Sequence, residues 1–181
     1  MKKGRKTEKH RRRLPIRLTA YHEGGHAVVA YILHRRFGSI SIVPEEDVEG
    51  RITLGKAKYI EPDWDTSRRC VIELEKRAMV LCAGVVAERL FTGRRHWKGS
   101  ENDITKAVDY LAYQCGNDEE VSAYLELIWI RTRNLLRLPQ HWAAVQAVAE
   151  ELLKNSFLGQ KRVRGIIFDA MHKSDSFVCT K

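Results

Sequence analysis

Apolar side chains recur every three or four positions along most of this 181-residue chain, the spacing of one buried face of an α-helix. Between residues 65 and 91 the apolar stripe consists of Val71, Leu74, Ala78, Leu81 and Val85. Asp65, Thr66 or Ser67 can cap the start of this helix, because a short polar side chain accepts a hydrogen bond from a free backbone N–H. The same spacing predicts further helices over residues 19–36, 100–115, 118–138, 140–155 and 160–172.

A different pattern follows the first predicted helix. Residues 39–43 read Ser-Ile-Ser-Ile-Val, and this alternation predicts a β-strand. Residues 51–60 form a second strand candidate, expected to pair with the first or to lie at an edge. Thr19 is expected to cap the first helix and Gly38 to end it. The pattern therefore predicts a mainly α fold with a small β-hairpin or short sheet.

Positive charge is concentrated at the N-terminus. Residues 1–17 hold nine Lys or Arg against one acidic residue, Glu8, so most of the formal net charge of +9 lies there. Such a block favours a disordered basic arm, whose simplest role is a solvated tail. The alternative role is docking to nucleic acid or to an anionic membrane surface. The remaining chain is nearly neutral, which predicts a domain over residues 18–172 and a loose tail over 173–181.

The composition also indicates where in the cell the protein is expected. The chain has no run of 18 apolar residues and no apolar signal segment near its start. Its four cysteines are widely spaced, without a C-x-x-C pair, so reduced thiols are expected. These features together predict a cytoplasmic protein.

The segment with the most distinctive chemistry is His22-Glu23-Gly24-Gly25-His26. Residues four apart share one face of a helix, so both imidazoles can reach the same metal ion, and Glu23 can take a proton from a metal-bound water. The bland alternative is a helix with exposed histidines. Two adjacent glycines weaken a helix, and we expect them where another helix or a substrate backbone approaches closely.

The pentapeptide alone leaves the third ligand open. A third histidine in the pattern H-E-x-x-H-x-x-G-x-x-H is excluded, because that position is Ile32. The carboxylates on offer are Glu73, Glu75, Glu88 and Asp103. Asp103 can be a third zinc ligand or simply a favourable charge at a helix N-terminus. Glu88 fits either as a surface side chain or as a hydrogen-bond partner that orients a ligand histidine.

Several segments match one known family in the right order. They are His22–Ala30 (HEGGHAVVA), Ile42–Pro44 followed by Leu54–Gly55, Ala83–Phe91 (AGVVAERLF), Gly99–Ala107 (GSENDITKA) and Val148–Leu153 (VAEELL). Together they resemble the peptidase domain of the FtsH-type ATP-dependent zinc metalloproteases. The resemblance implies a helical zinc-peptidase domain with its small β-element beside the active site. It implies that His22, His26 and Asp103 hold Zn²⁺ and that Glu23 is the catalytic base.

The resemblance also implies partners. The substrate would be an unfolded or extended polypeptide, added by main-chain hydrogen bonds to an edge strand formed by Ile52, Thr53 and Leu54. The family carries an ATPase module and usually membrane anchors before this domain, and we expect neither in this chain. An ATPase or unfoldase acting in trans and a homo-oligomer are therefore candidate partners. The alternative function is a non-proteolytic zinc-binding adaptor or peptide-binding module.

Overall fold

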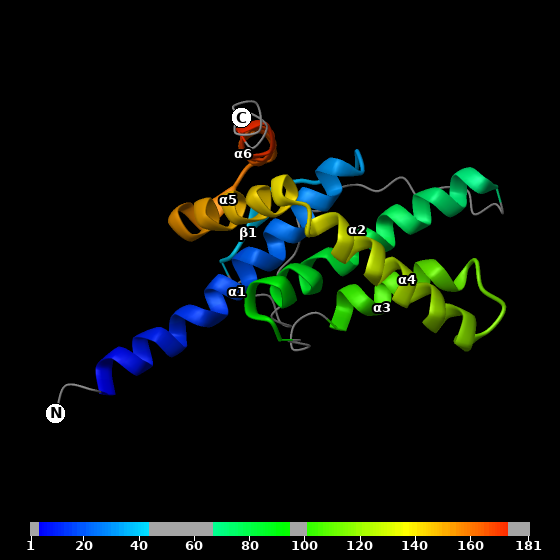
Figure 1. Ribbon diagram of the computed structural model, residues 1–181, viewed down its shortest axis with the longest axis horizontal. Helices are drawn as coiled ribbons and strands as arrows, with labels where there is room; N and C mark the ends of the chain where they lie inside the picture. Colours follow the sequence, from blue (N-terminus) through cyan, green and yellow to red (C-terminus); the bar gives the residue numbers. More distant parts are fainter. Residues whose placement is uncertain (1–3, 44–66, 95–100, 174–181) are drawn as a thin grey trace, which may run out of the picture.

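The computed structural model describes residues 4–43, 67–94 and 101–173 (Figure 1). Most of these residues are helical, which confirms the expected mainly α fold. The helices are α1 (Gly4–Ile32), α2 (Arg68–Thr92), α3 (Glu101–Ala112), α4 (Asp118–Leu136), α5 (Pro139–Asn155) and α6 (Gln160–Lys173). Two short strands, β1 (Ile40–Ser41) and β2 (Phe157–Leu158), form an antiparallel sheet. None of the described helices is long and apolar enough to cross a membrane.

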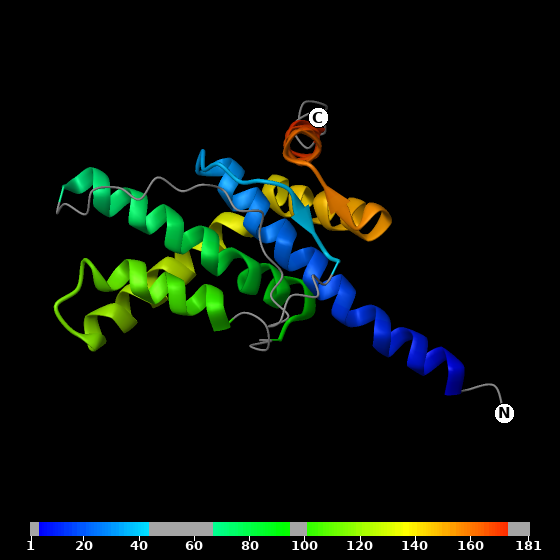
Figure 2. The ribbon, with the colours of Figure 1, turned by 180° about the vertical axis from the view of Figure 1, so that it is seen from behind.

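The C-terminal half of α1 is the helix around which the others are assembled. It packs against α2 and α5 (Figures 1 and 2). Ala27, Val28, Val29 and Ala30 are each at most 2% exposed, because neighbouring elements enclose this part of the helix on several sides. The N-terminal part of the same helix extends away from the packed helices in both views.

The start of α1 differs from the sequence prediction. The helix begins at Gly4, so Thr19 lies in its interior and does not cap it. Residues 4–17 continue the helix that carries the pentapeptide, where a disordered basic arm was expected. The prediction rested on the block of basic residues, which is typical of disordered segments, but Lys and Arg are themselves good helix formers.

The ends of α2 follow from local chemistry. Ser67, one of the three predicted caps, accepts a hydrogen bond from the backbone N–H of Cys70 at 3.2 Å. At the other end Gly93 takes the left-handed conformation, with φ of 71°, and its N–H bonds the carbonyl of Arg89. Between these caps the predicted stripe faces the core, and Leu74 is only 1% exposed.

The small sheet joins two distant parts of the chain. Ile40 pairs with Leu158 and Ser41 with Phe157, so the partner of β1 is the segment between α5 and α6. The second strand candidate of the sequence analysis, residues 51–60, lies outside the described residues. Ser156 ends α5 with a positive φ of 59°, and this turn carries the chain back alongside β1.

The end of α1 also departs from prediction. The helix stops at Ile32, and His34 takes a positive φ of 55°, a turn that had been assigned to Gly38. Further back, the glycine pair does allow close approach. A Cβ on Gly25 would lie 2.5 Å from the carbonyl oxygen of Ala83 on α2, and one on Gly24 would lie 3.1 Å from that of Val145 on α5. Neighbouring helices, not a substrate, account for both glycines.

Candidate metal centre

The buried half of α1 carries three polar side chains into the protein interior. His22 is 8% exposed, Glu23 3% and His26 2%. Buried polar groups of this kind need partners, because leaving water without them costs free energy. The alternative without a function, a helix with exposed histidines, is therefore excluded by the structure.

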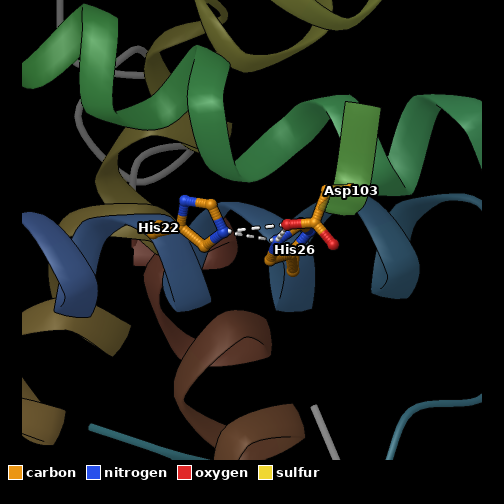
Figure 3. Close-up of side chains that lie close together, drawn as sticks. All are labelled: His22, His26 and Asp103. Carbon is orange, nitrogen blue, oxygen red and sulfur yellow. Dashed lines mark hydrogen bonds and ion pairs between the residues drawn. The ribbon is translucent and has the colours of Figure 1, made fainter. Parts of the chain in front are cut away.

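Asp103, in the first turn of α3, meets the two histidines of α1. Its Oδ2 lies 3.2 Å from Nε2 of His22 and 3.3 Å from Nε2 of His26. The two Nε2 atoms are 2.9 Å apart. Figure 3 shows the two imidazoles and the carboxylate turned toward one another. Three ligand atoms from two helices thus converge within 4.8 Å of one another.

The outer nitrogen of each imidazole is held by a fixed acceptor. Nδ1 of His26 lies 2.7 Å from the carbonyl oxygen of Val80, and Nδ1 of His22 lies 2.7 Å from Oε1 of Glu88. A carbonyl can only accept, so His26 donates from Nδ1 and, in the neutral ring, presents a lone pair at Nε2. The neutral ring of His22 does the same opposite Glu88. Two lone pairs and a carboxylate then face one point, an arrangement that a cation stabilises.

The spacing of these atoms suits zinc. Ligands bound tetrahedrally at about 2.0–2.1 Å from zinc lie about 3.3 Å from one another. The three separations here run from 2.9 to 3.3 Å. Imidazole nitrogen with one carboxylate is a set that suits zinc better than calcium or magnesium, which prefer oxygen alone. In metal sites, the ring nitrogen of a ligand histidine that does not face the metal usually makes a hydrogen bond, as Nδ1 does in both histidines here.

The pKa values of His22 and Asp103 also show that this cluster of side chains favours a positive charge. Burial alone would lower the pKa of His22, but hydrogen bonds with Asp103 and Glu88 outweigh it and raise the pKa to about 10. Burial would raise the pKa of Asp103, but the neighbouring His26 and His22 hold it well below its usual range. Either a proton on His22 or a metal ion between the three side chains would supply that positive charge.

Glu23 is placed and tuned differently. Burial raises its pKa, while the charges of His26 and His22 partly oppose the shift. Its Oε2 atom is buried and has no hydrogen-bond partner among the described residues. A carboxylate next to a candidate metal ligand, with a raised pKa, is better suited to accept a proton than an ordinary glutamate.

Comparison with known proteins identifies the family. Residues 8–115 match peptidase family M41, and this match covers more than half of the chain. The chain belongs to peptidase family M41. The M41 match includes α2, α3 and all but the first four residues of α1, and therefore all three converging residues.

Individual relatives agree with the M41 assignment. The chain is 37% identical over 99 residues to the ATP-dependent zinc metalloprotease FtsH of Pirellula staleyi. It is 30% identical over 118 residues to the FtsH of Lachnoclostridium phytofermentans and 34% identical over 98 residues to that of Haemophilus influenzae. These matches cover 53%, 61% and 50% of this chain, but only 13%, 19% and 14% of the relatives.

The structure distinguishes among the four carboxylates that the sequence provides as candidates for the third ligand. Asp103 and Glu88 both reach the histidines, one at the ligand atoms and one behind His22. Glu73 is bound instead by Arg35 and Lys76. Glu75 accepts a hydrogen bond from Tyr124 at 2.6 Å and pairs with Arg131 at 3.1 Å. The candidate edge strand of Ile52, Thr53 and Leu54 lies outside the described residues.

Sequence reasoning missed two groups at the M41 centre. The Val80 carbonyl belongs to the backbone, so no side-chain pattern signals it. A glycine inside a helix, such as Gly84, suggests by itself only tight packing against another helix, yet a Cβ there would lie 2.5 Å from Nε2 of His22. Cys82 is also near, but burial and the charge of Asp103 raise its pKa to about 12, which keeps its thiol protonated at neutral pH.

Proposed function

We propose that this M41 chain is a zinc-dependent metalloendopeptidase that acts on unfolded or extended polypeptides. The observation that carries the proposal is the convergence of His22, His26 and Asp103 beside the buried carboxylate of Glu23. The names of the relatives, each an ATP-dependent zinc metalloprotease, support it.

In this proposal His22, His26 and Asp103 hold the zinc ion. Bound zinc would polarise a substrate carbonyl and lower the pKa of a water molecule in the site. Glu88 and the Val80 carbonyl fix the two rings through their Nδ1 atoms, so both Nε2 atoms keep their lone pairs toward the ion. Three protein ligands would leave a fourth position for water or substrate, as in other catalytic zinc sites.

Glu23 moves the proton. Its carboxylate accepts a proton from the attacking water as the C–O bond to the scissile carbonyl forms. It then donates this proton to the peptide nitrogen, which leaves as an amine when the C–N bond breaks. The raised pKa of Glu23 brings it closer to neutrality, where a carboxyl group can both accept and release a proton.

The substrate and partners are part of the same proposal. An extended polypeptide would add to the strand candidate formed by Ile52, Thr53 and Leu54. The relatives are ATP-dependent, and the chain matches 13 to 19% of their length. An ATPase that unfolds substrates in trans and a homo-oligomer of this chain are therefore partners worth testing.

The direct test is Glu23→Gln. The variant should retain one zinc per chain, because Glu23 contributes no ligand atom, and should lose cleavage of unfolded casein by a factor of at least about 100. Glu126→Gln, an exposed change of the same kind on α4, is the matched control and should keep full activity. Full activity in Glu23→Gln would refute the mechanism. If the unaltered chain binds zinc but cleaves no peptide library, the adaptor function replaces the peptidase.

A further inference from the structure

Gly84, in the interior of α2, lies directly against the two imidazoles. A Cβ built on this residue would be 2.5 Å from Nε2 and 2.6 Å from Cε1 of His22, and 2.6 Å from Nε2 of His26. Ordinary contacts between such atoms are about 3.5 Å, so a methyl group there would overlap both rings by about 1 Å. Any residue other than glycine must displace the ligand nitrogens.

The rings cannot easily move away. His22 is held at Nδ1 by Glu88 and His26 by the Val80 carbonyl, each at 2.7 Å. Both rings are also buried, His26 almost completely. A side chain at position 84 would therefore break these hydrogen bonds or spread the two Nε2 atoms.

The same carbon would also crowd a bound ion. The Cβ position is almost equally far from the two Nε2 atoms, which are 2.9 Å apart. A zinc ion about 2.0–2.1 Å from each of these nitrogens would lie no more than about 3.5 Å from that carbon. From these distances we propose that Gly84 is a positioning residue of the metal centre, whose missing side chain leaves the space in which the ligands and the ion fit.

Close packing of α1 on α2 does not explain Gly84. That contact is made by Gly25, whose Cβ would meet the backbone of Ala83 and the side chain of Ala87. The neighbours of Gly84 are the ligand rings themselves. Alanine is the better helix former at an interior position, so glycine at 84 is a local cost that the metal centre explains.

The first test measures metal binding to Gly84→Ala in the full chain. Zinc affinity is measured by competition with a chromophoric chelator, and Co²⁺ serves as a spectroscopic probe of ligand geometry. We expect a loss of about 10–100-fold in zinc affinity, the range found when the support of a metal ligand is disturbed, and altered visible bands of Co²⁺. Gly165→Ala on α6 is the matched control, because nothing lies within 4 Å of its Cβ. A folded Gly84→Ala protein with zinc affinity within twofold of the unaltered chain and an unchanged Co²⁺ spectrum would overturn the proposal.

The second test needs no metal. Melting temperatures are compared in chelator for Gly84→Ala alone and for Gly84→Ala combined with His22→Ala and His26→Ala. The substitution should lower the melting temperature, or prevent folding, when the rings are present. It should raise it by about 2–4 °C when they are absent, because only the helix preference of alanine then remains. Equal destabilisation in both backgrounds would place the clash elsewhere and overturn the proposal.

This inference rests on the proposed zinc site but not on peptidase activity. An unaltered chain that binds zinc and cleaves nothing would refute the peptidase while leaving the role of Gly84 intact. An unaltered chain that binds no zinc would overturn both. Normal zinc binding by Gly84→Ala would overturn the role of Gly84 alone.

Discussion

Glu88 offers a sharp test of how the metal centre is held. Its Oε1 atom lies 2.7 Å from Nδ1 of His22, and both residues are buried. The contact keeps the proton of His22 on Nδ1 and its lone pair on Nε2, toward Asp103. Replacing Glu88 should therefore weaken zinc binding, although Glu88 contributes no ligand atom.

Two substitutions separate the charge of Glu88 from its hydrogen bond. Glu88→Gln can still accept from Nδ1 through its amide oxygen but lacks the charge. Glu88→Ala leaves a buried N–H without this acceptor, which costs about 1–3 kcal/mol of stability. We expect zinc affinity to fall by about 10-fold in the glutamine variant and toward 100-fold in the alanine variant, or about 1.4 and 2.7 kcal/mol of binding free energy.

The assay is a zinc titration in competition with a chelator, at constant pH and ionic strength. Glu75→Gln is the matched control on the same helix, because Glu75 bonds Tyr124 and Arg131 instead of the histidines. Its zinc affinity should match that of the unaltered chain. If Glu88→Ala also binds zinc within twofold of the unaltered chain, orientation of His22 by Glu88 is refuted.

Two further predictions concern stability. Free zinc at 100 times its Kd should stabilise the native chain by about 2.7 kcal/mol, a rise in melting temperature of roughly 5–10 °C. Asp103→Ala should show little of this rise at the same zinc concentration, and an equal rise in that variant would remove Asp103 from the ligand set. Separately, burial alone would raise the pKa of Glu73, but a hydrogen bond from Lys76 and the charge of Arg35 lower it below 4.5. The stabilisation that the ionised Glu73 gives to the folded state is fully present above its ordinary pKa of 4.5. It is lost as the pH falls through the lowered pKa of the folded state. Glu73→Gln should therefore reduce the loss of stability in acid, by at most about 1 kcal/mol. Urea unfolding of both proteins at pH 7 and pH 3 measures this loss. If the variant loses as much stability between the two pH values as the unaltered chain, the reasoning is wrong.

The helices were predictable where burial and capping agree with the apolar pattern. Ser67 caps α2, and α5 ends at Asn155, as the sequence suggested. The prediction failed for the start of α1, since no apolar pattern marks its basic segment. The sequence analysis did not find the pairing of β1 with β2, because a two-residue strand carries little information about which distant segment will pair with it.

The metal centre divides in the same way. The i, i+4 spacing alone places His22 and His26 on one face of a helix. The resemblance to the FtsH family supplied Asp103, and the residue pattern allowed Glu88 two equal roles. Spacing could not show that α2 brings the Val80 carbonyl and Gly84 against the rings, because these contacts depend on how closely α1 and α2 pack. Local geometry therefore predicts the two candidate histidine ligands, and tertiary packing decides how their rings are oriented.

Charge links this orientation to the proposed chemistry. With neutral imidazoles, the buried cluster holds the carboxylates of Glu23, Glu88 and Asp103, an arrangement that is costly without compensating positive charge. A divalent ion offsets two of the three negative charges. Burial and the charges of Asp103 and Glu88 raise the pKa of Glu23, against the opposing effect of His26 and His22. Burial, together with the neighbouring carboxylates that favour a metal ion, therefore raises the pKa of Glu23 above that of an ordinary glutamate and favours transfer of a proton from water to Glu23.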